Sequence, residues 1–193
     1  NPGDPYVPFN LAAALLQQGR FEEAARYYEQ ALSIEPADAR THFNLGFALL
    51  NLGQPEQAIG HFEQALRIDP SYAEAHVILG SALFDKGNLP EAKSHWEQAL
   101  RLKPTFAEAH YNLGNAFLKE GRLEKAMEHY RQAIRIKPEF ADAYCNYGIA
   151  LEQASRTREA IEQYEQAVLL RPDLTELQKR LDLLRELQAR KTR

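Results

Sequence analysis

Histidine is the residue type whose number and regular spacing first suggest metal chemistry in this sequence. The six histidines form two sets of three, and the members of each set are 34 residues apart. The sets are His42, His76 and His110, and His61, His95 and His129. A zinc motif such as H-E-x-x-H places two histidines one helical turn apart on one face of a helix. The spacing here does not, so we predict no metal site and assign the histidines to packing.

The sequence offers no nucleophile with a reason to be reactive. Nothing around Cys145, the single cysteine, would activate its thiol, so we interpret it as a packing residue. The serines, aspartates and glutamates form no triad or carboxylate pair that can be placed in one pocket. We therefore predict that the 193 residues contain no catalytic site, are not an enzyme and need no cofactor.

Four asparagines carry the most regular polar chemistry. Asn10, Asn44, Asn112 and Asn146 follow the same 34-residue spacing, and Ile78 interrupts the series. A side-chain amide both donates and accepts hydrogen bonds, so a row of amides can bind the backbone of an extended peptide whatever its sequence. Alternatively, each asparagine ties its own helix to the neighbouring one. We predict peptide binding.

Aromatic and charged residues flank these asparagines. The aromatic ones are Phe9, Phe43, Phe47, Phe84 and Tyr111. They could form apolar pockets for ligand side chains, or simply pack the helices together. The expected charges are Glu74, Asp85, Glu108, Asp142 and Glu152 against Arg40 and Lys119, which favours a basic or neutral ligand.

The elements that position these residues come from a sequence that repeats every 34 residues. The residues that recur are Pro36, Pro70, Pro104, Pro138 and Pro172, together with Ala24, Ala58, Ala92, Ala126 and Ala160. A fixed period of this length is typical of stacked-repeat proteins. The units are 5–38, 39–72, 73–106, 107–140 and 141–174. Residues 1–4 are the expected end of a preceding repeat or linker, and 175–193 the expected C-terminal capping helix.

Each unit shows two stretches with apolar residues at helical spacing, so we predict a first and a second helix per unit. Gly19, Gly53, Gly87 and Gly121 should end the first helices in a left-handed conformation. Ser155 takes this place in the fifth unit, where the turn should be slightly strained or use a different geometry. Small residues such as Gly114 should let the two helices approach closely. Large residues such as Tyr130 should fill the space between neighbouring pairs.

These recurring residues resemble the tetratricopeptide repeat family over residues 5–172. The resemblance implies an all-α, right-handed superhelical solenoid of antiparallel helix pairs, whose first helices line a concave peptide-binding groove. The asparagine series is similar to the one in the repeat domain of O-linked N-acetylglucosamine transferases. One subset of the family binds acidic chaperone tails with a carboxylate clamp, and its best fit here is Asn115, Asn146 and Arg180. Tyr111 and Glu176 stand where that clamp needs lysines, so we do not expect chaperone-tail binding.

Composition narrows the class of partner. The net charge is −4, from 23 basic and 27 acidic residues, which does not suggest nucleic acid as a partner. No apolar run is long enough for a membrane span, and the single cysteine permits a reducing compartment, so we expect a cytoplasmic protein.

We therefore predict a protein-interaction scaffold that binds a peptide or segment of a partner protein in its groove. One alternative is the substrate-targeting repeat domain of a larger enzyme, such as a glycosyltransferase. The other is a repeat protein that assembles with copies of itself into a homo-oligomer.

Overall fold

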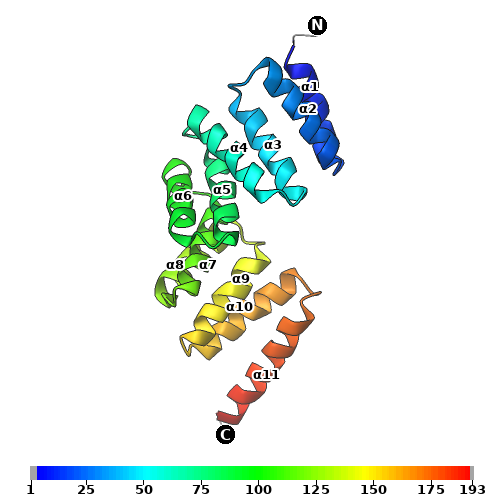
Figure 1. Cartoon of the computed structure of the whole chain (residues 1–193). Coiled ribbons are helices and arrows are strands. Elements are labelled where there is room, and N and C mark those ends of the chain that lie inside the picture. The colour runs from blue at the N-terminus through cyan, green and yellow to red at the C-terminus, as the bar shows by residue number, and fades with distance from the viewer. Residues whose placement is uncertain (1–3, 192–193) are drawn as a thin grey trace. The chain divides into compact units, whose positions relative to one another are not determined.

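The computed structural model describes residues 4–191, with side chains up to residue 190. This part of the chain contains eleven α-helices and no strand (Figure 1). Of the predicted remnant at residues 1–4, only Asp4 lies within the described residues, and its carboxylate accepts the backbone N–H of Tyr6 at 3.0 Å. None of the described helices is both long enough and apolar enough to cross a membrane.

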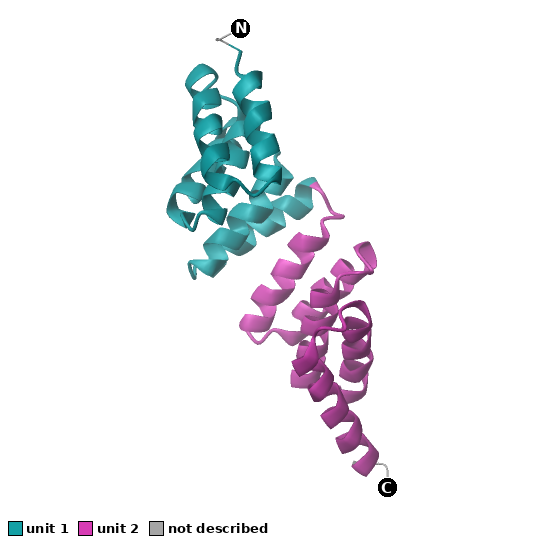
Figure 2. Cartoon of the chain, turned by 90° about the vertical axis from the view of Figure 1, so that its right-hand side faces the viewer, with its two compact units in different colours: residues 1–102 teal, residues 103–193 magenta. Residues whose placement is uncertain are grey.

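The chain divides into two compact units, residues 1–102 and residues 103–193 (Figure 2). The first contains α1 (Tyr6–Gln17), α2 (Phe21–Ile34), α3 (Ala39–Asn51), α4 (Pro55–Ile68), α5 (Ala73–Asp85) and α6 (Leu89–Leu102). The second contains α7 (Ala107–Lys119), α8 (Leu123–Ile136), α9 (Ala141–Gln153), α10 (Thr157–Leu170) and α11 (Thr175–Lys191). Within each unit, every helix packs against the next one in sequence. The odd-numbered helices α1 to α9 are the first helices of the repeats, and the even-numbered helices are the second.

The turn inside each repeat confirms the predicted backbone conformation. Gly19 has a φ of +73°, and its N–H and that of Arg20 bind the carbonyls of Leu16 and Leu15, the pattern of a Schellman cap. Ser155 makes the same turn with a φ of +60°. Only this residue combines a side chain with a positive φ in the described chain, so it carries the backbone strain that glycine avoids elsewhere.

In the second to fifth repeats, the core forms where a glycine on the first helix meets an aromatic ring on the second, and Ala12 takes the glycine's place in the first repeat. A Cβ added at Gly114 would lie 2.5 Å from the ring of Tyr130, and one at Gly148 would lie 2.4 Å from Tyr164. Both rings are fully buried. The small residue therefore makes room for the ring, and this contact sets how closely the two helices pack.

Helix α11 covers the last second helix, α10. It buries Leu181 and Leu184, and Leu177 is half-buried. Arg185 on this helix pairs with Glu165 of α10 at 2.7 Å. The apolar side of α11 thus packs against α10, as expected of an amphipathic helix.

Candidate functional site

In the first unit, the aromatic residues predicted for ligand binding differ in how much they are exposed. Phe43 is half-buried and packs against Phe62 and Tyr72, with ring centroids 5.7 and 4.8 Å apart. Phe84 is half-buried against Trp96 at 5.7 Å. Phe47 is 38% exposed and is thus the aromatic side chain of this group most accessible to a ligand.

Phe47 lies at the edge of a pocket between α3 and α5. The pocket has a volume of about 270 Å³ and is lined mainly by apolar side chains. Its lining includes Phe47, Leu50, Asn51, Ile78, Ala82 and Asp85. Asn10 on α1 is exposed and Asn44 on α3 is half-buried, so both amides are within reach of solvent.

In the second unit, three of the predicted residues join in one polar cluster. Asn146 on α9 donates from Nδ2 to Asn115 Oδ1 at 2.8 Å and to the Tyr111 hydroxyl at 3.1 Å, both on α7. Tyr130 on α8 donates to the same Asn115 oxygen at 2.8 Å. Burial raises the pKa of both Tyr111 and Tyr130, so their hydroxyls stay protonated at physiological pH. The cluster thus brings together Tyr111, Asn115 and Asn146, while Asn112 on α7 is half-buried.

Arg180 occupies a different part of the second unit. It forms an ion pair with Glu152 of α9, and Glu152 also accepts the Tyr164 hydroxyl at 3.1 Å. These three residues line a pocket of about 550 Å³ between α9 and α11, together with Cys145, Ile149 and Leu177. Arg180, Asn115 and Asn146, the three residues that best fitted a carboxylate clamp, are thus engaged with neighbouring side chains.

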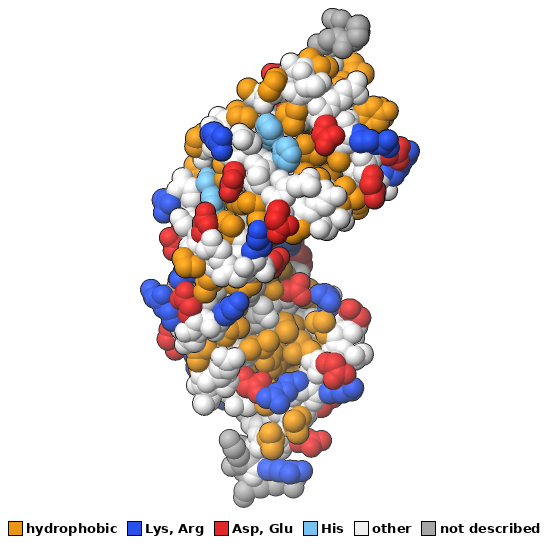
Figure 3. Space-filling view, in the orientation of Figure 1, with side chains coloured by type: hydrophobic (Ala, Val, Ile, Leu, Met, Phe, Trp, Pro, Cys, Tyr) orange, Lys and Arg blue, Asp and Glu red, His pale blue; other side chains and the backbone are white. Residues whose placement is uncertain are grey.

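Two of the carboxylates predicted for the groove form ion pairs with basic residues that follow the second helix of the same repeat. Lys137 pairs with Glu108 at 3.2 Å, and Arg171 pairs with Asp142 at 2.9 Å. Because these side chains are exposed, each pair contributes little to stability. They partly neutralise the acidic charge of the first helices. The face of the molecule in Figure 3 carries charges of both signs interspersed with hydrophobic side chains.

The histidines meet in three pairs, which sequence reasoning missed. His76 Nδ1 lies 2.9 Å from His95 Nδ1, and its Nε2 lies 3.2 Å from the carbonyl oxygen of Pro70. The same two distances are 3.0 and 3.1 Å for His42–His61, and 3.1 and 3.3 Å for His110–His129. Since only a donor can face a carbonyl, Nε2 of each first-helix histidine carries the proton and its Nδ1 accepts from the partner. The constant offset of 19 residues within a pair was the available signal.

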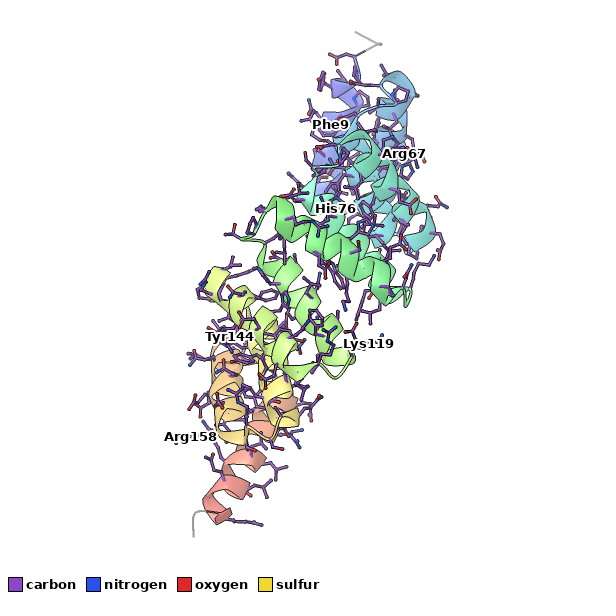
Figure 4. The ribbon with its side chains drawn as sticks, turned by 90° about the vertical axis from the view of Figure 1, so that its left-hand side faces the viewer. Phe9, Arg67, His76, Lys119, Tyr144 and Arg158 are labelled. Carbon is purple, nitrogen blue, oxygen red and sulfur yellow. The ribbon has the colours of Figure 1, made fainter. Side chains whose placement is uncertain are left out.

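The histidine pairs belong to the helix packing. His76, labelled in Figure 4, is buried in the first unit. Among the described residues, no three histidine, cysteine, aspartate or glutamate side chains come together in a way that could hold a metal ion.

Comparison with solved structures places the fold among repeat proteins. A crystal structure of MamA shares 30% identity and has a TM-score of 0.75, with 86% of this chain and 96% of that one covered. MamA of Desulfovibrio magneticus RS-1 shares 25% identity and has a TM-score of 0.78, covering 88% and 96%. YrrB, described as a TPR protein with an unusual peptide-binding site, shares 23% identity and has a TM-score of 0.74, covering 93% and 92%. No curated protein sequence matches this chain.

Sequence profiles give the same assignment. One tetratricopeptide repeat profile matches residues 79–140, and a second matches residues 15–76, 52–95 and 117–182. These matches indicate a repeat family of interaction scaffolds and no catalytic family. Together with the paired helices and the left-handed turns, they show that the chain belongs to the tetratricopeptide repeat family.

Proposed function

We propose that this chain is an interaction scaffold that binds an extended segment of a partner protein along its first helices. The proposal rests on the hydrogen bonding of the Asn146 side-chain amide. Its Nδ2 group is held by Asn115 and Tyr111, while no group in residues 4–191 donates to its Oδ1 atom. This oxygen is therefore oriented in advance and remains an acceptor for a backbone N–H of a ligand.

Two further observations, each made within a single unit, support the proposal. Asn10 is exposed, and Asn44 and Asn112 are half-buried, so the remaining members of the asparagine series are also at the surface. The apolar pocket beside Phe47 could receive a ligand side chain while amides bind the ligand backbone. A related fold has been described as peptide-binding in YrrB, so this architecture is able to form such a site.

The test is a selection of peptides from a random library, followed by affinity measurements on the enriched peptides. One variant carries Asn10→Ala, Asn44→Ala, Asn112→Ala and Asn146→Ala. The control carries four changes on second helices, Gln30→Ala, Gln57→Ala, Gln64→Ala and Gln166→Ala. After circular dichroism shows that both variants fold, we expect at least about a tenfold loss of affinity in the first only, the effect of about 1.4 kcal/mol. Equal affinities for all three proteins would place binding elsewhere.

A further inference from the structure

The pocket between α3 and α5 has a polar side with a definite hydrogen-bonding character. Asn51 Nδ2 donates to the backbone carbonyl of Phe47 at 2.9 Å, which leaves its Oδ1 atom as an acceptor. Asp85 is exposed, and its carboxylate has neither a hydrogen-bond nor an ion-pair partner in residues 4–191. The rim of the pocket thus offers an amide oxygen and a carboxylate.

The apolar side of the pocket restricts what can pair with that rim. Phe47, Leu50, Ile78 and Ala82 supply the apolar lining, and Phe47 presents an exposed aromatic ring. A purely apolar ligand side chain would remove water from the Asp85 carboxylate without replacing its hydrogen bonds, which is unfavourable. An acidic side chain would be repelled by the same carboxylate.

A side chain with an aliphatic stem and a cationic head matches both sides. Lysine and arginine lay their methylene groups along apolar surface while keeping the charge at a polar edge. An arginine can in addition stack on an aromatic ring and form two parallel hydrogen bonds with a carboxylate. The net charge of −4 also favours the approach of a cationic segment.

We propose that this pocket binds an arginine or lysine side chain of the partner segment. The methylene stem lies against Phe47, Leu50 and Ile78, and the charged head pairs with Asp85 and with Asn51 Oδ1. The inference rests on the proposed function, since the side chain belongs to the segment bound along the first helices. It adds that the site selects cationic residues at one position of that segment.

The experiment uses the same random peptide library against the wild type, Asp85→Asn and a control, Glu63→Gln. Glu63 is an exposed carboxylate on α4 without a hydrogen-bond or ion-pair partner in the described chain. Asp85→Asn keeps the shape of the side chain and removes its charge. An enriched peptide is then resynthesised with citrulline in place of its arginine, which also keeps the shape and removes the charge.

We expect peptides enriched on the wild type and on Glu63→Gln to carry arginine or lysine at one fixed position, and those enriched on Asp85→Asn to lack this preference. Citrulline should weaken binding to the wild type by about tenfold and binding to Asp85→Asn by less than twofold. Phe47→Ala should weaken the binding of the arginine and citrulline peptides alike, because it removes contacts to the methylene stem that both side chains share.

The contrary outcomes separate the two proposals. Peptides that lose affinity with the asparagine changes but show no cationic preference overturn the present inference and leave the proposed function standing. The same holds if citrulline costs as much affinity on Asp85→Asn as on the wild type. A library that yields no peptide sensitive to the asparagine changes overturns both proposals.

Discussion

The buried hydroxyl of Tyr130 donates a 2.8 Å hydrogen bond to Asn115 Oδ1, the same oxygen that accepts from Asn146. A core side chain of a second helix thereby fixes the orientation of an amide on the first-helix surface. In the first repeat the equivalent hydroxyl, that of Tyr28, is buried without a partner among the described residues, and burial raises its pKa to about 12. The same aromatic position thus has a polar role in one repeat and not in the other.

Removing these two hydroxyls should have opposite effects on stability. Tyr130→Phe takes a donor from Asn115, and we expect it to lower the free energy of unfolding by about 1–2 kcal/mol. Tyr28→Phe removes an unpaired buried group, and we expect no loss or a gain of up to about 1 kcal/mol. Urea unfolding of both variants measures the difference, and losses of equal size would contradict it.

The strain at Ser155 can be relieved by one substitution. With a φ of +60°, Ser155→Gly should raise the free energy of unfolding by about 0.5–1 kcal/mol, because glycine adopts this conformation without steric cost. Gly121→Ser is the matched reverse change. Its φ is +71° and a Cβ there would meet no atom within 4 Å, so any loss comes from the backbone alone. Unfolding by urea or heat tests the pair, and a destabilised Ser155→Gly would refute the interpretation.

In the substitution Gly114→Ala, the steric contact with Tyr130 should affect stability more than the higher helix propensity of alanine does. Gly114→Ala places a Cβ 2.5 Å from the Tyr130 ring, and we expect it to cost about 1–3 kcal/mol through overpacking. Gly60→Ala, also inside a helix but with no atom within 4 Å, should instead gain about 0.5–1 kcal/mol. Comparison of their denaturation midpoints decides whether the close packing is as tight as described.

The histidine pairs should make stability depend on pH. Burial is the main cause that lowers the pKa of His61, His76, His95 and His110, and it lowers that of His129 to about 4. A folded-state pKa below the unfolded value of about 6.5 means that the native state binds fewer protons. The contribution of these neutral histidines to the free energy of unfolding is therefore complete above pH 6.5 and is lost as the pH falls towards 4.

Nearby charges modify this effect without reversing it. The negative charge of Glu91 raises the pKa of His95, and that of Glu128 raises the pKa of His110 and of His129. Positive charges have the opposite effect. Arg101 lowers the pKa of His76, Arg135 lowers that of His110, and Lys125 lowers that of His129. Burial remains the largest cause at all of these histidines.

The fifth repeat supplies a natural control for this prediction. Tyr144 and Gln163 stand there in place of a histidine pair, and Tyr144 is marked in Figure 4. Urea unfolding from pH 7 to pH 4 should show a shallower loss of stability for His110→Tyr/His129→Gln than for the wild type, by on the order of 1–3 kcal/mol. Identical slopes would show that this pair does not titrate during unfolding.

The periodic sequence predicted the helices and turns because these depend on residues close together in the chain. Gly121 adopts the expected left-handed conformation, and Ser155, for which strain or a different geometry was expected, keeps the left-handed conformation as well. The partners of Asn146 and Arg180 were not predictable in the same way. They depend on which rotamers meet across two helices, and a 34-residue period does not encode that. The ligand-binding role of the asparagines stays a prediction.

The carbonyl of Pro70 ends one repeat, yet it accepts a hydrogen bond from His76 in the next, which in turn is bonded to His95. The turn that follows α4 and the helices α5 and α6 thus share one chain of hydrogen bonds, so a movement of that turn should weaken the contact between α5 and α6. Local opening should therefore spread from one repeat to its neighbour. Amide hydrogens of α4, α5 and α6 should exchange with solvent at a common rate, as a single cooperative element of the array.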